Sequence, residues 1–222
     1  MFGLDDKIAG FSDGTTLVVV VGVSILLGLR HASDPDHVAA VTTLMASGRE
    51  RASRGAAKLG LAWGLGHATT LFVFGLPVVL FTAYLPEWVQ AGTETGVGAV
   101  IVALALVLLV RWRRGAFCRG AHVHSTRTRL QAYGIGLVHG MGGTAGIGLL
   151  LLATIQSHLL AVVALALFAV CTAVSMALLS FGLGVALSRA PVDRIAPVLG
   201  VASLAFGVWY ALGAQGVVPY ML

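Results

Sequence analysis

The chain has 222 residues, of which 58% are hydrophobic and only 10% are charged, with a formal net charge of +5. A soluble domain usually carries about 25% charged residues, and several runs here approach the roughly 20 apolar residues that cross a bilayer. These numbers exclude an ordinary soluble domain and indicate an all-α, polytopic membrane protein.

The acidic opening MFGLDDKIAGFSDG is not typical of a secretory signal peptide. After it, six apolar segments are predicted to be transmembrane helices, at about 15–46, 58–84, 96–112, 130–153, 159–188 and 196–214. The first, third and fifth connecting loops are basic, whereas the second and fourth carry no lysine or arginine. Because basic loops stay in the cytoplasm, we expect both termini to lie outside an inner cell membrane. The positive charge then reflects topology, so no nucleic-acid partner is expected.

The first predicted helix contains the charged segment GLRHASDPDHVAA. On an unbroken helix, His31 and His37 would lie about 120° apart, with Asp34 between them. Pro35 favours the alternative of a helix that ends near Ala32 and begins again with Asp34 as its N-cap. The first half-helix would then end with free carbonyl groups near His31, and such an end attracts cations.

The two halves of the chain resemble each other. LGLRHASDPDHVAAV aligns with IGLVHGMGGTAGIGL, which places His31 over His139, and TLFVFGLPV aligns with ALLSFGLGV at nearly the same offset. Each half has three helices, an odd number, so a duplicated second half would be inverted in the membrane, with helices broken at the binding site as in many transporters. We expect a first three-helix repeat over 1–114, a cytoplasmic basic and histidine-containing loop over 115–129, and a second repeat over 130–222.

Ionisable side chains inside a membrane are costly and usually mark a pathway or a site. Imidazole and carboxylate groups together suit a divalent transition metal. We therefore predict a metal site made by His31, Asp34, Asp36, His37, His67 and His139. One of the aspartates is expected to orient an imidazole instead of binding the ion.

Several of these residues can also have a purely structural role instead of binding metal. Asp34 can be only a helix cap, His67 and His139 can be buried polar groups bonded to neighbours, and GMGGTAG can serve close helix packing. Arg30 is expected to pair with an aspartate or to extend towards the cytoplasm, and Met141 is expected to pack. The loop segment CRGAHVH is expected to be solvated, with metal handling as the alternative.

The segment RHASDPDHV resembles the RHAxDADHI signature of nickel/cobalt transporters of the NiCoT or NicO superfamily, with the H-x4-DH core at His31, Asp36 and His37. GLGHATT, which contains His67, resembles the family's second motif, and GLVHGMGGTAG resembles its short urease-accessory-type, UreH-like branch. The acidic LGxDTATE motif of larger members has no match. The resemblance implies a transporter of Ni²⁺, with Co²⁺ as a second candidate, that uses alternating access. Its partners would be the metal ion, as transported substrate and not prosthetic group, the bilayer and, as an option, further copies of the chain.

Other classes of function fit the sequence less well. No GxxxxGK[ST] motif for nucleotide hydrolysis and no HExxH motif of a metalloprotease occurs, and we expect no enzyme activity. A thiol–disulfide carrier needs a cysteine in each half, but Cys118 lies in a loop and Cys171 has no counterpart. A haem cytochrome with paired histidines is a minor alternative. The main alternative is a metal-binding accessory or sensor subunit that does not carry the ion.

Overall fold

The computed structural model describes residues 14–47, 53–81, 86–117, 128–140, 142, 149 and 152–219. Its helices in these ranges are α2 (Gly14–His31), α3 (Pro35–Ser47), α4 (Ser53–Phe81), α5 (Glu87–Arg113), α6 (Arg129–His139), α8 (His158–Arg189) and α9 (Val192–Ala214). The predicted all-α class is therefore confirmed for the part of the chain that is described. The acidic N-terminal segment, the loop segment CRGAHVH and Met141 lie outside it.

Four of these helices, α4, α5, α8 and α9, are long and apolar enough to cross a membrane. Helices α2 and α3 meet the same criterion as a pair, bent by 48° at the break between them, which raises the number of candidate spans to five. A sixth span stays a prediction, because most of 141–151 lies outside the described residues. These spans confirm a polytopic membrane protein.

Several helices begin earlier than their apolar segments do, most clearly α4 and α5. Helix α4 begins at Ser53 instead of near 58, and α5 begins at Glu87 instead of near 96. Pro86 immediately precedes α5, and Glu87 places a negative charge in its first turn, where the helix dipole favours it. Hydropathy marks only the stretch that lies in lipid, whereas the helix continues into polar residues beyond it.

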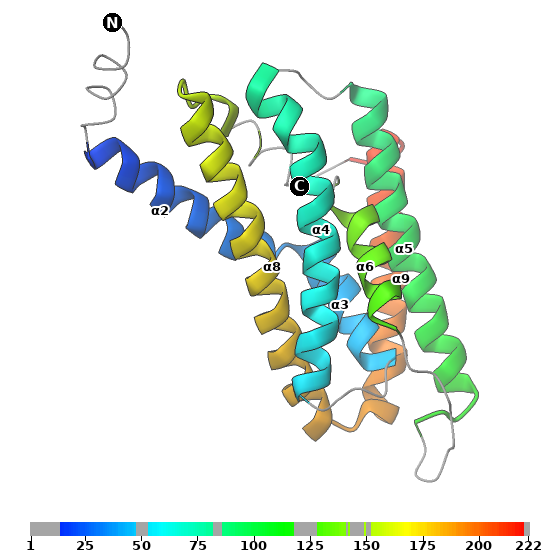
Figure 1. Ribbon diagram of the computed structural model, residues 1–222. Helices are drawn as coiled ribbons and strands as arrows, with labels where there is room; N and C mark the ends of the chain where they lie inside the picture. The colour runs from blue at the N-terminus through cyan, green and yellow to red at the C-terminus, as the bar shows by residue number, and fades with distance from the viewer. Residues whose placement is uncertain are drawn as a thin grey trace, which may run out of the picture.

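The long helices form a bundle, and α2 leans away from it at one side (Figure 1). Helix α4 packs against both α6 and α8, α5 packs against α9, and α2 packs against α8. The short helix α3 contacts α5, α8 and α9, so that its first turn lies inside the bundle. The break between α2 and α3 and the end of α6 meet near the middle of α4, where His31 and Gly140 lie against His67.

Small residues let the central helices approach closely. A Cβ atom added to Gly64 of α4 would lie 2.8 Å from the Cα atom of Ala173 of α8. Between α3 and α9, the Thr43 hydroxyl donates a buried hydrogen bond of 2.9 Å to the Ser203 hydroxyl. Small residues and interhelical hydrogen bonds are the usual means of helix association in lipid. The outward faces carry apolar side chains such as Val18, which is 71% exposed, as a lipid-facing surface requires.

Candidate metal centre

The first predicted helix is broken where Pro35 indicated. Helix α2 ends at His31 and α3 begins at Pro35. The Asp34 carbonyl accepts the backbone N–H of Val38 at 2.9 Å, as expected of a residue at the N-cap position. Oδ2 of the Asp34 carboxylate accepts a hydrogen bond of 3.0 Å from Nδ1 of His31. Asp34 therefore lies at the start of α3 and also contacts a predicted ligand.

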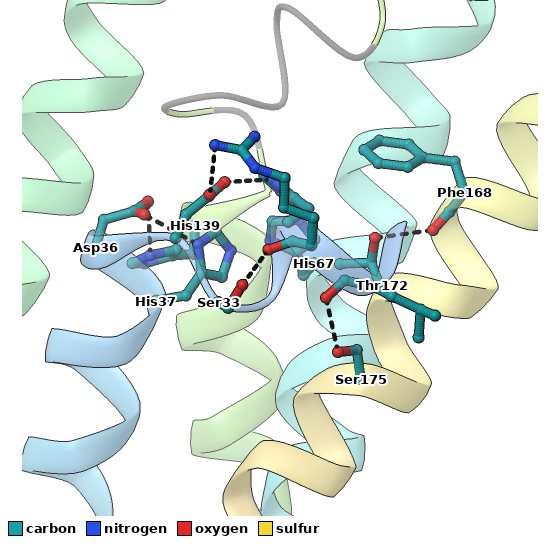
Figure 2. A network of polar contacts seen from close by, with 12 residues as sticks. Ser33, Asp36, His37, His67, His139, Phe168, Thr172 and Ser175 are labelled. Atoms are coloured by element: carbon teal, nitrogen blue, oxygen red, sulfur yellow. Dashed lines mark hydrogen bonds and ion pairs between the residues drawn. The ribbon is translucent and has the colours of Figure 1, made fainter. Parts of the chain in front are cut away.

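The carbonyl groups at the end of α2 are not free. The Leu29 carbonyl accepts the Ser175 hydroxyl at 3.0 Å, and the Arg30 carbonyl accepts the Ser33 hydroxyl at 2.6 Å (Figure 2). The His31 carbonyl accepts a backbone N–H from three residues further on, at 3.2 Å. The expectation that the carbonyls at this helix end are free is wrong for these three residues, because the serines and the turn donate hydrogen bonds to them. Side chains are the candidate ligands.

The six predicted site residues lie together in one buried cluster, the histidine–aspartate cluster. They come from the end of α2 (His31), the break (Asp34), the first turn of α3 (Asp36 and His37), the middle of α4 (His67) and the end of α6 (His139). None of them is more than 4% exposed. Figure 2 shows Asp36 and His37 at the start of α3 with His139 beside them.

On one side of the cluster, two imidazole rings are in contact with each other. Nε2 of His31 lies 3.0 Å from Nε2 of His67. Because the Asp34 carboxylate accepts from Nδ1 of His31, Nε2 of His31 carries the lone pair and Nε2 of His67 donates. Asp34 thus orients His31 and sets its tautomer, the role expected of a carboxylate behind a metal-binding imidazole.

The other side contains a carboxylate between two imidazoles. Nδ1 of His37 donates to Oδ1 of Asp36 at 3.0 Å. Oδ2 of Asp36 lies 3.3 Å from Nε2 of His139, an ion-pair distance without hydrogen-bond geometry. Among the described residues, these two atoms and Nε2 of His37 have no hydrogen-bond partner, although all three are buried.

His37 lies at the centre of the cluster. Its ring centroid is 4.7 Å from those of His31 and His139 and 5.0 Å from that of His67. Trp63, which the sequence analysis missed, packs at 5.6 Å from both His37 and His139. The signal that was available is its position on α4, one helical turn before His67.

The end of α6 is held against α4 by two glycines. A Cβ at Gly140 would lie 2.5 Å from the His67 carbonyl oxygen, and one at Gly136 would lie 2.8 Å from the His67 amide nitrogen. The Thr70 hydroxyl adds a hydrogen bond of 2.9 Å to the Leu137 carbonyl. Glycine permits this approach, which brings His139 next to the residues of the first half.

Arg30 lies at the edge of the cluster and is not a ligand. Its Nη2 is 3.9 Å from Oδ1 of Asp34, and its side chain is 70% exposed. The predicted pairing with an aspartate is confirmed, although a pair whose arginine is exposed and lies at so long a distance contributes little to stability.

The cluster offers two groups of three ligand atoms that lie within 4.8 Å of one another, one in His31, His37 and His67 and the other in Asp36, His37 and His139. Buried imidazoles with carboxylates beside them suit a divalent first-row metal ion. Two nitrogens at right angles around such an ion, as in octahedral coordination, each about 2.1 Å from it, stand about 3 Å apart. The 3.0 Å between His31 and His67 fits this spacing.

Residues 17–129 of the chain match the family model described as NicO, high-affinity nickel-transport protein. The chain belongs to the NicO family. The matched region contains five of the six residues of the cluster, and His139 lies beyond it. Membership confirms the resemblance that the motif RHASDPDHV indicated, and a transporter family is not a family of enzymes.

Two curated relatives of this NicO protein are similar to it over part of its length. It is 28% identical over 155 residues to the urease accessory protein UreH of Bacillus sp. (strain TB-90), covering 65% of this chain and 67% of UreH. It is 33% identical over 107 residues to the high-affinity nickel transport protein of Cupriavidus necator, covering 46% of this chain but only 28% of that protein. No solved structure matches the chain.

Proposed function

We propose that this protein carries a divalent transition metal ion, Ni²⁺ first and Co²⁺ as second candidate, across the inner cell membrane. The observation that carries the proposal is the burial of four histidines and two aspartates in one cluster inside a membrane-spanning bundle. Such groups are costly in a membrane and are kept where an ion passes. The proposed ion site consists of His31, Asp34, Asp36, His37, His67 and His139, with Asp34 orienting His31.

The donor atoms suit a late first-row transition metal ion, a class that includes nickel. Nitrogen donors outnumber carboxylates in the cluster, and imidazole suits Ni²⁺, Co²⁺, Cu²⁺ and Zn²⁺ better than Mg²⁺ or Ca²⁺. Ni²⁺ lies above Co²⁺ in the general order of affinity for such donors. The names of the family and of the Cupriavidus relative, which both refer to nickel transport, point to the same ion.

Alternating access between two inverted repeats is the proposed mechanism. A Cβ at Gly28 of α2 would lie 2.7 Å from the carbonyl oxygen of Phe168 and 3.2 Å from the amide nitrogen of Thr172, one turn apart on α8. Its counterpart in the sequence alignment, Gly136 of α6, approaches α4 in the same way, at the carbonyl of Trp63 and the amide nitrogen one turn on. Matching contacts of α2 with α8 and of α6 with α4 support a two-fold relation.

The proposed repeats cover 1–114 and 130–222, with six transmembrane helices in all and the loop 115–129 between the repeats. The basic loops are proposed to face the cytoplasm and both termini the outside. Moving a divalent ion inward through 100 mV is worth about 4.6 kcal/mol, so uptake needs no ATP hydrolysis.

The second candidate is an accessory or sensor subunit that binds the metal without carrying it. The similarity to UreH, which is named a urease accessory protein, favours this alternative. An accessory or sensor subunit would bind the metal ion at the same residues but would not carry it across the membrane. A measurement of metal flux therefore separates the two candidate functions.

The test is a flux assay with the purified chain in proteoliposomes, using a panel of divalent metals with and without a membrane potential. We expect Ni²⁺ to cross, and His37→Ala to abolish its flux because His37 is at the centre of the cluster. The double variant with alanine at His122 and His124, in the basic loop, is the control and should keep most of the flux. A loop variant without flux beside a fully active His37→Ala would contradict the site. Ni²⁺ binding without flux in any condition would establish the accessory or sensor function instead.

A further inference from the structure

The two groups of ligand atoms in the cluster share one residue. The histidine group consists of His31, His37 and His67, and the carboxylate group consists of Asp36, His37 and His139. The histidine group borders α8, since the ring of Phe168 lies 5.6 Å from that of His31. The carboxylate group lies at the end of α6, against Trp63. The two groups are therefore adjacent but face different helices.

Only one nitrogen of His37 is available to an ion. Its Nδ1 donates to Asp36 at 3.0 Å, so the lone pair is on Nε2, which has no hydrogen-bond partner within the described ranges. One lone pair binds one ion. Two divalent ions a few ångströms apart would also repel each other strongly in so buried a place. An ion in one group therefore excludes an ion from the other.

The two groups differ in how much must change before an ion binds. In the histidine group, Nε2 of His67 donates to Nε2 of His31 at 3.0 Å, so this bond has to break and the His67 proton has to move to Nδ1 before both Nε2 atoms can bind an ion. In the carboxylate group, Oδ2 of Asp36 and Nε2 of His139 are 3.3 Å apart without a hydrogen bond. The carboxylate group also adds a negative charge. The carboxylate group should therefore bind the ion with higher affinity than the histidine group.

We propose that the cluster holds one ion in two alternative positions and that His37 passes the ion between the histidine group and the carboxylate group. This inference rests on the proposed transport function. An ion that moves through a membrane must be bound well enough to enter and weakly enough to leave, and several shared positions meet both needs. His37 stays bound while the partners on either side are exchanged.

Binding is measured first, with Ni²⁺ and the purified full chain in lipid nanodiscs, by equilibrium titration and X-ray absorption. His67→Ala removes the histidine group, His139→Ala removes the carboxylate group, and His37→Ala removes both. His158→Ala, at the exposed start of α8, is the control. Glutamine variants at the same positions serve where an alanine variant does not fold.

We expect the wild type, His158→Ala, His67→Ala and His139→Ala each to bind one Ni²⁺. His139→Ala should bind about tenfold to a hundredfold more weakly, with nitrogen ligands alone from the protein, and His67→Ala should keep a carboxylate oxygen. His37→Ala should lose binding. Two ions in the wild type would overturn the inference. It would equally fail if His67→Ala and His139→Ala both lost binding as His37→Ala does, since that outcome means one undivided site.

Flux in proteoliposomes is the second measurement. His67→Ala and His139→Ala should each lower the Ni²⁺ flux at least about tenfold, although both variants still bind the ion. The reason is that each variant keeps only one of the two positions. Wild-type flux in either variant would overturn the proposed transfer of the ion between the two groups. If the wild type binds Ni²⁺ but shows no flux, the proposed transport function fails, and the titrations alone still decide whether two positions exist.

Discussion

Replacing Gly136 by alanine tests whether the contact between α6 and α4 positions His139. The added Cβ would lie 2.8 Å from the amide nitrogen of His67 and closer still to the carbonyl oxygen of Trp63. Ordinary contacts of this kind begin at about 3.4 Å, so the two helices must separate by more than about 0.6 Å. Metal–ligand distances tolerate only about 0.2 Å. His139, less than one turn further along α6, would move well beyond that limit.

The expected result is a loss of Ni²⁺ affinity of about tenfold or more, with all six residues of the cluster unchanged. Overpacking costs about 1–3 kcal/mol, and the gain from removing a helical glycine is about 1 kcal/mol, so the variant should still fold. The matched control is Gly134→Ala, on the same helix, where the added Cβ meets nothing within 4 Å. The assay is Ni²⁺ titration of both variants in nanodiscs, with thermal unfolding beside it.

Gly134→Ala should bind like the wild type and unfold at the same or a slightly higher temperature. Equal Ni²⁺ affinity in the two glycine variants would refute the reasoning, because the close approach of α6 to α4 would then have no part in placing His139.

Three further predictions follow from the same geometry and topology. A cysteine introduced at Ser53 should react with an impermeant reagent only from the cytoplasmic side, and one at Thr93 only from outside; labelling of Ser53 in intact cells would reverse the proposed orientation. His31→Cys combined with His139→Cys should be bridged by a short thiol crosslinker, since the centroids of both rings lie 4.7 Å from that of His37, and Ni²⁺ should no longer bind to the bridged protein. Ni²⁺ should quench tryptophan fluorescence in the wild type, and Trp63→Phe should remove most of the quenching; unchanged quenching in this variant would place the ion elsewhere.

Much of this protein could be predicted from the sequence, because the signals are local. Apolar composition predicts membrane helices, and Pro35 predicts the break between α2 and α3, since proline lacks an amide hydrogen and restricts the residue before it. The charge of GLRHASDPDHVAA inside an apolar segment marks the site, because such charge has a high cost in lipid. The NicO family was recognisable from the same motif.

Other features depended on contacts that no local pattern encodes. The hydropathy of α5 could not show that it begins at Glu87, because a helix in water has no apolar signal. The carbonyls at the end of α2 were expected to be free, but Ser175 of α8 and Ser33 satisfy two of them. Trp63 was missed because an indole on an apolar helix is most often core, and only its contacts with His37 and His139 distinguish it.

The sequence by itself predicted, from charge, motif and repeat, the six residues that lie together in the buried cluster. Only the tertiary structure decided how they are grouped, with His67 beside His31 and His139 beside Asp36. The reason is that residue types and helix breaks follow from interactions within a few positions of the chain. The partner of each imidazole follows from which helices can approach closely, and here glycine backbones on α6, lying against α4, permit that approach.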